Sequence, residues 1–141
     1  MNTHEETVVF ETTDWKVVLV PDQLYLGRSV AVLKRPCGDL ADQREGEVLD
    51  WLELVKKLQG LLTKTFGATM FNWSCLMNDA YQAIPARPQV HWHCRARYRH
   101  PVEFNGFKFE DPNFGHHILD GEMLVSHEML RAINLKLQEN L

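Results

Sequence analysis

The sequence predicts an α+β fold, in which an antiparallel sheet of about five strands is covered by one long helix and followed by a C-terminal helix. Short β-rich runs separated by turn-forming residues occupy the first part of the chain, and one long segment repeats apolar residues every three or four positions. The chain has 141 residues, the length of one domain. We therefore expect residues 1–141 to form a single domain, with 99–141 as a C-terminal extension packed on it.

Three strands are predicted before the long helix. Residues 7–10 and 15–20 are β-rich and are separated by a polar, turn-prone stretch, which favours a hairpin. Pro21 ends the second run, and Gly27 precedes a third run at 28–33, which Pro36 and Gly38 end. These runs predict an antiparallel meander.

The long helix is predicted from Asp42 to Phe66. Asp42 and Glu45 have the spacing of a capping box, and Gly67 is a stop signal. The apolar stripe expected to face the sheet consists of Val48, Trp51, Leu52, Val55, Leu58, Leu62 and Phe66. At about 1.5 Å per residue this helix should cross the whole sheet.

The polar residues of greatest interest lie on the two strands that follow. Residues 70–77 alternate apolar and polar side chains, and the polar face carries Asn72, with Asn78 just beyond the run. Residues 79–87 form a short loop, so this strand and the next should be hairpin neighbours. The two asparagines are therefore expected beside His91 and His93 of the next strand.

Strict alternation in residues 89–98 separates an apolar face from a polar one. Val90, Trp92 and Cys94 point to one side, and the other side carries Gln89, His91, His93, Arg95 and Arg97. Two imidazoles on one strand face can divide a reaction between nucleophile and proton donor. The arginines add planar donors suited to phosphate oxygens.

This stretch resembles the histidine triad family, whose signature is His-x-His-x-His-x-x with mostly apolar residues at x. His91 matches the middle, nucleophilic histidine, His93 matches the third, and Gln89 replaces the first. A Pro-Gln-x-His-x-His form is also known among small bacterial members. The resemblance covers about residues 15–98; the two asparagines and the Leu-Gly-Arg stretch at 26–28 are also similar to it.

The resemblance implies a nucleotide hydrolase or nucleotidyl transferase that acts at the α-phosphate of dinucleoside polyphosphates or nucleoside phosphoramidates. It would act through a covalent nucleotidyl-histidine intermediate on His91. The predicted catalytic residues are His91, His93 and Gln89, and the predicted substrate-binding residues are Asn72, Asn78, Arg87 and Arg97. The loop at 84–87 lacks the glycine and hydroxyl residues that many relatives use to bind phosphate. No cofactor is expected, and a homodimer is implied.

Two other functions stay open. A protein of this fold could bind nucleotides, or serve as a scaffold, with little catalysis, because glutamine at position 89 cannot carry a proton. The four histidines His91, His93, His116 and His117 could instead hold a divalent metal, since imidazole is a common zinc ligand. No Cys-x-x-Cys or His-Glu-x-x-His motif supports the metal site.

Composition narrows the class of partner. A formal charge of −4 and the lack of a lysine or arginine run argue against general nucleic-acid binding. No apolar segment has the length of a membrane span, and the N-terminus does not resemble a signal peptide. The three cysteines, Cys37, Cys75 and Cys94, are predicted to be reduced, as in a cytoplasmic protein.

The last part of the chain is predicted to be mostly loop before a final helix. A short strand is expected around residues 107–109. Ser126 can cap a helix whose apolar stripe would be Leu130, Ile133, Leu137 and Leu141.

Overall fold

The computed structural model describes residues 7–141, and it contains the predicted antiparallel sheet of five strands. The strands lie in the order β1-β2-β3-β5-β4. Their bounds are Val8–Glu11 (β1), Trp15–Leu19 (β2), Ser29–Leu33 (β3), Met70–Ser74 (β4) and His91–Arg97 (β5). The fold class is thus confirmed, and β5 lies between β3 and the edge strand β4.

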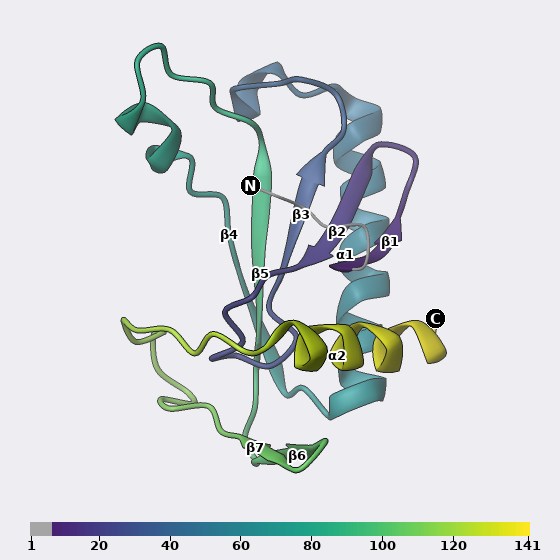
Figure 1. The fold of residues 1–141 in the computed structure, drawn as a ribbon. Helices are drawn as coiled ribbons and strands as arrows, with labels where there is room; N and C mark the ends of the chain where they lie inside the picture. Colours follow the sequence, from purple (N-terminus) through teal and green to yellow (C-terminus); the bar gives the residue numbers. More distant parts are fainter. Residues whose placement is uncertain (1–6) are drawn as a thin grey trace.

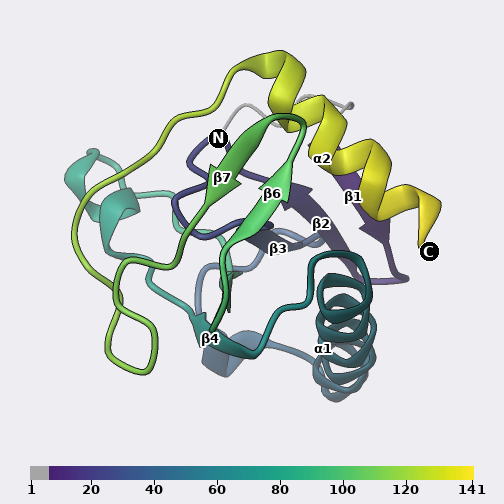
Figure 2. The same cartoon turned by 90° about the horizontal axis from the view of Figure 1, so that it is seen from below.

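Helix α1 (Glu45–Phe66) covers one face of this sheet, and α2 (His127–Glu139) packs along the edge strand β1 near one end, where its C-terminal end also contacts α1 (Figures 1 and 2). Residues of both helices and of the sheet form one apolar core around Trp15, which is fully buried. Gly67 ends α1 as predicted, with φ of 75° in the left-handed region that glycine adopts at little cost.

The predicted cap of α1 is wrong. The helix begins at Glu45 after Arg44, and the Glu47 carboxylate accepts a hydrogen bond from the Arg44 amide. Asp42 instead ends a short 3-10 helix, Leu40–Asp42, which Asp39 caps. Arg35 forms an ion pair with Glu47 at 2.9 Å, and this bond lowers the pKa of Glu47 to about 2.

The predicted apolar stripe of α1 is wrong in its first half. Val48 and Leu52 are each 45% exposed, whereas Leu54 and Leu61 are buried. The helix is rotated because Glu47 faces the sheet: its carboxylate is held by Arg35, and its carbonyl accepts the Trp15 indole hydrogen at 2.9 Å. Residues four positions apart share a helix face, so Val48 and Leu52 point outward together.

Strand β4 is shorter than predicted. It ends at Ser74, and the chain then forms a 3-10 helix, Asn78–Gln82. Asn78 therefore does not lie on the strand, although the predicted pairing of β4 with β5 is confirmed.

The C-terminal extension contains the predicted short strand and the predicted helix. Strand β7 (Phe107–Phe109) pairs with β6 (Val102–Phe104), which sequence patterns did not indicate. The Ser126 hydroxyl accepts a hydrogen bond from the Met129 amide at 3.1 Å, as expected of a cap. Three residues of the predicted stripe on α2 are buried, but Leu141 is exposed beyond the helix end.

The extension packs on the main sheet at two places. Asn134 and Gln138 of α2 donate hydrogen bonds to the Val8 carbonyl of β1, both at 3.1 Å. The segment before α2 runs along the Pro21 to Tyr25 segment, where Leu124 forms a β-bridge with Asp22. In Figure 1 this segment passes in front of the end of β5 that leads to the β6–β7 hairpin. None of the described helices is both long and apolar enough to span a membrane.

Candidate active site

The histidine side chains project from the central part of the sheet. In β5, His91 pairs with Val32 of β3, and His93 pairs with Val30 of β3 and Ser74 of β4. Directly opposed residues of antiparallel strands share a face, so these side chains form two adjacent rows. Both imidazoles are half-buried.

The other face of β5 belongs to the core, as alternation predicts. The Trp92 ring lies 4.8 Å from the Trp51 ring of α1, and Cys94 is buried. The histidines therefore point away from α1. Figure 1 shows none of the described helices in front of the end at which β5 begins.

The backbone just before β5 holds His91 in one tautomer. Its Nδ1 lies 2.7 Å from the Gln89 carbonyl oxygen. Because a carbonyl can only accept, Nδ1 carries the hydrogen and Nε2 keeps its lone pair. A neutral imidazole in this state can attack an electrophile without first losing a proton.

The Gln89 side chain is committed to the backbone that follows β3. Its Nε2 donates to the carbonyls of Leu33 and Arg35, each at 2.8 Å, and its Oε1 accepts from the Cys37 amide at 3.0 Å. Both amide hydrogens are therefore used. The Gln89 side chain therefore anchors the backbone at residue 89, whose carbonyl oxygen lies against His91 Nδ1.

His93 lies beside His91, with ring centroids 5.0 Å apart and planes at 72°. Burial, together with charge repulsion from His91, Arg28 and Arg95, lowers the pKa of His93 to about 4. His93 is therefore neutral at neutral pH and can offer a single hydrogen-bond donor. Its Nδ1 is buried and has no hydrogen-bond partner among the described residues.

The predicted substrate-binding role of Arg97 has no support in this geometry. Arg97 is fully buried, and its five N–H groups all donate: two to Asp111, one to the Asn72 side chain, and one each to the carbonyls of Asn113 and His116. Asn72 is thereby occupied as well. Arg97 thus anchors the C-terminal extension to the sheet, and Asn72 helps to hold Arg97 in place.

The remaining two predicted binding residues lie at the surface. Arg87 is exposed and makes no hydrogen bond or ion pair within residues 7–141. Asn78 is also exposed and lines a hollow of about 420 Å³ with Gly38, Asp39, Leu40, Cys75, Met77 and Tyr81. Cys75 lies next to the His91 backbone, so this hollow borders the start of β5.

Two arginines outside the predicted catalytic and binding residues lie on the histidine face. Arg95 follows His93 by one pleat repeat and is half-buried, and Arg28 directly precedes β3. Arg28 forms an ion pair with Asp22 at 2.6 Å. The alternation of β5 places Arg95 correctly, but nothing in the sequence indicates that Arg97 would be buried and Arg95 left unpaired.

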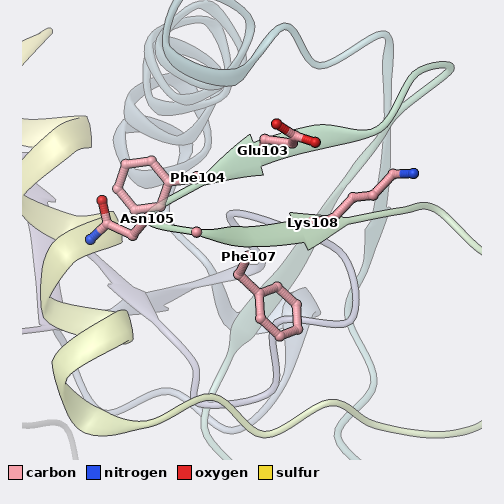
Figure 3. A pocket seen from close by; sticks show the side chains of 6 residues that line it. Glu103, Phe104, Asn105, Phe107 and Lys108 are labelled. Atoms are coloured by element: carbon pink, nitrogen blue, oxygen red, sulfur yellow. The ribbon is translucent and has the colours of Figure 1, made fainter.

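A second cavity, of about 260 Å³, lies at the β6–β7 hairpin and is lined by residues 103–108. Figure 3 shows the Glu103 and Lys108 side chains on one side of the hairpin and the Phe107 side chain on the other. None of the predicted site residues lines this cavity. Its side chains do not converge on one point as a catalytic site requires.

Within residues 7–141 there is no group of three or more histidine, cysteine or acidic side chains that could hold a metal ion. His116 and His117 are exposed on the extension, and their carbonyls accept hydrogen bonds from Arg97 and Asn113. They do not join His91 and His93 in one such cluster.

The fold is shared with solved histidine triad proteins. A histidine triad protein from Marinobacter aquaeolei VT8 is 18% identical, with a TM-score of 0.71 over 99% of this chain and 95% of that one. The C. elegans NitFhit protein is 19% identical, with a TM-score of 0.70 over all of this chain; the chain spans only 29% of that protein. A zinc-bound histidine triad family protein from Mycobacterium smegmatis is 17% identical, with a TM-score of 0.57 over 94% of this chain and 84% of that one. By sequence, no family model and no curated protein matches.

Proposed function

From the histidine triad fold and the tautomer of His91, we propose that this chain is a nucleotide hydrolase or nucleotidyl transferase. It acts at the α-phosphate of a dinucleoside polyphosphate or a nucleoside phosphoramidate. The observation that carries the proposal is the 2.7 Å hydrogen bond from His91 Nδ1 to the Gln89 carbonyl, which directs the lone pair of Nε2 away from the backbone.

The reaction has two displacements. His91 Nε2 attacks the α-phosphorus, an N–P bond forms, and the bond to the leaving group breaks with its electron pair on the leaving group. A water molecule then attacks the same phosphorus, an O–P bond forms, and the electron pair of the N–P bond returns to Nε2. The proton that the water loses passes to the solvent, and an amine leaving group takes up a proton from the solvent. The Gln89 carbonyl stabilises the positive charge that develops on the His91 ring.

Neighbouring residues would hold the phosphate oxygens. His93 is neutral at neutral pH because burial lowers its pKa to about 4, so it would donate one uncharged hydrogen bond. Asn78, at the hollow that borders β5, would donate its amide to a non-bridging oxygen. Arg87 is exposed without partners in the described residues and would contact the leaving group.

The test is turnover of a panel of adenosine phosphoramidates and dinucleoside polyphosphates by the wild-type protein and by His91→Ala. We expect turnover to fall by at least about 10³-fold in His91→Ala, with the melting temperature unchanged, because the lost interaction is made in the transition state. His100→Ala removes an exposed histidine and serves as the control. Equal turnover in both variants contradicts the proposal.

One observation favours a second candidate, a nucleotide-binding protein with little catalysis. Gln89 uses both amide hydrogens on backbone carbonyls and cannot supply a proton to a leaving group. In that case nucleotides bind to the wild-type protein and to His91→Ala alike, and the wild-type protein turns over no member of the panel.

We also propose that the chain forms a homodimer. Three apolar residues, Val48, Leu49 and Leu52, are exposed together on α1, and β4 is an edge strand with Met70 exposed. Exposed apolar surface and open strand edges favour association. Light scattering at micromolar concentration should give twice the chain mass; Leu49→Glu with Leu52→Glu should give the monomer mass.

A further inference from the structure

Two arginines oppose each other on the histidine face of the sheet. Ser29 pairs with Cys94 in the register of β3 and β5, so the next pair of residues in the same direction is Arg28 and Arg95. Residues opposed across antiparallel strands share a face, and like charges in this position are destabilising. A pair of cations kept at the sheet surface therefore needs a compensating anion.

The protein supplies only part of that compensation. Asp22 binds Arg28 at 2.6 Å, but its other oxygen already accepts from the amides of Leu24 and Met123. Arg95 has neither a hydrogen bond nor an ion pair within the part of the chain that the structure describes. Burial lowers the pKa of Arg95, and the charge of Arg28 lowers it further. The Asp22 carboxylate therefore has to compensate the charges of both Arg28 and Arg95.

Three buried polar atoms on this face also have no partner among residues 7–141. They are Arg28 Nε, His93 Nδ1 and Ser74 Oγ. Ser74 of β4 pairs with His93. Val30 of β3 pairs with His93 as well, and Arg28 lies one pleat repeat before Val30 on the same face. Buried polar groups are nearly always hydrogen-bonded, and these three in adjacent rows are not used by the described part of the chain, so they are candidate contacts for a ligand. Arg28 Nε and Ser74 Oγ can both donate, as can Arg95, and a phosphate offers acceptor oxygens for all three.

We propose that Arg28 and Arg95, with Ser74, bind a second phosphate group of the substrate. The proposal rests on the proposed function, in which the reacting phosphate lies at His91. Arg95 is four residues from His91 along β5, which corresponds to roughly 13 Å at the usual rise of a strand. The second phosphate therefore lies well beyond the linkage that is broken, and the preferred substrate is a nucleotide with two separated phosphate groups.

The second phosphate can come from two parts of a nucleotide. It can be a phosphate on the ribose of the retained nucleoside, or a distal phosphate of the polyphosphate chain. Both sources present the same dianion to Arg95, and they differ in how they connect to the α-phosphate. Adenosine 3′,5′-bisphosphate represents the first source and adenosine 5′-triphosphate the second.

The subsite is tested first with inorganic phosphate, without any nucleotide. We measure the melting temperature at fixed ionic strength for the wild-type protein, Arg95→Gln and Arg95→Met, with Arg131→Gln on the exposed surface of α2 as the charge control. Phosphate should stabilise the wild-type protein and Arg131→Gln and have little effect on the Arg95 variants. Without phosphate, the Arg95 variants should melt at the same temperature as the wild-type protein or higher, because an unpaired cation has been removed.

Calorimetry then identifies the source of the phosphate, in the His91→Ala background so that no nucleotide is consumed. One of the two nucleotides should bind at least about tenfold more tightly than adenosine 5′-monophosphate, and Arg95→Gln should abolish that difference. Equal phosphate stabilisation in Arg95→Gln and the wild-type protein overturns the subsite, as does a lower melting temperature of both Arg95 variants without phosphate. Binding of phosphate through Arg95 without binding of any nucleotide keeps the subsite and overturns the proposed function.

Discussion

Arg95 and Arg97 lie two residues apart on the same face of β5, and their surroundings are opposite. Arg97 is fully buried, its five N–H groups all donate, and Asp111 pairs with it at 2.6 Å. Arg95 is half-buried and has no partner in the described part of the chain. The difference arises because the C-terminal extension brings Asp111, Asn113 and the His116 carbonyl to one arginine only.

This contrast separates two tasks on one strand. The Arg97 end fastens the extension and has no free donor for a ligand. The stretch from His91 to Arg95 keeps unpaired donors and a fixed imidazole lone pair, which stabilise nothing in the folded chain. Groups left unsatisfied in this way are typical of functional sites.

The largest effect on stability is expected for Arg97→Met. Removing one partner of a buried pair leaves the Asp111 carboxylate uncompensated, which typically costs about 3 to 5 kcal/mol. Burial alone would raise the pKa of Asp111, but the hydrogen bonds from Arg97 and from the backbone amides of Asn113 and Tyr98 lower it. Urea unfolding should show this loss. A loss below about 1 kcal/mol would mean that the extension does not depend on Arg97.

A smaller loss is expected for Gln89→Ala, which removes three hydrogen bonds to backbone groups. Because each hydrogen bond contributes about 1 kcal/mol, the free energy of unfolding should fall by roughly 2 to 4 kcal/mol. Turnover should also fall, because the carbonyl that orients His91 loses its support. Gln82→Ala, at an exposed position, is the control. Reduced stability with unchanged turnover would show that Gln89 does not position His91.

The pH dependence of stability should report His93. Its pKa is about 4 in the folded protein, against an ordinary value of 6.5, so the unfolded chain binds more protons between these values. The contribution of His93 is fully present above pH 6.5 and is lost as the pH falls toward 4. Compared with the wild-type protein, His93→Gln should show a flatter stability curve in this window. The pKa values of the Glu47 and Asp111 carboxyl groups are lowered, so these groups change the stability mainly at pH values below this window.

The smallest effect is expected for Arg95→Met, the counterpart of Arg97→Met. Its free energy of unfolding should stay within about 1 kcal/mol of the wild-type value or rise, because the variant relieves repulsion from Arg28. The same urea experiment measures it. A loss equal to that of Arg97→Met would remove the distinction between the two ends of β5.

The sequence predicted the fold where periodicity was unambiguous. Alternation over residues 89–98 placed His91 and His93 on the face away from α1, and Ser126 and Gly67 marked helix ends correctly. The start of α1 was mispredicted because Asp42 and Glu45 have capping-box spacing, whereas the Arg35 and Glu47 pair, twelve residues apart, sets the real start and rotation.

Among the predicted site residues, local pattern could not separate bound from free side chains. Arg97 has the same alternation as Arg95, and only its contacts with Asn72 and with residues 111–116 show that its donors are used within the chain. The importance of Arg28 depends on the register of β3 with β5, which a sequence does not reveal. The roles of His91, His93, Gln89, Asn78 and Arg87 in catalysis and binding stay predictions.

The central claim is that His91 becomes covalently attached to the nucleotide. The protein is mixed with an adenosine phosphoramidate or a dinucleoside polyphosphate, quenched without acid because N–P bonds are acid-labile, digested and examined by mass spectrometry. An adenylyl mass increase on the peptide that contains His91, absent in His91→Ala, is the predicted result. Full turnover by His91→Ala, or an adduct on another residue, would contradict the claim.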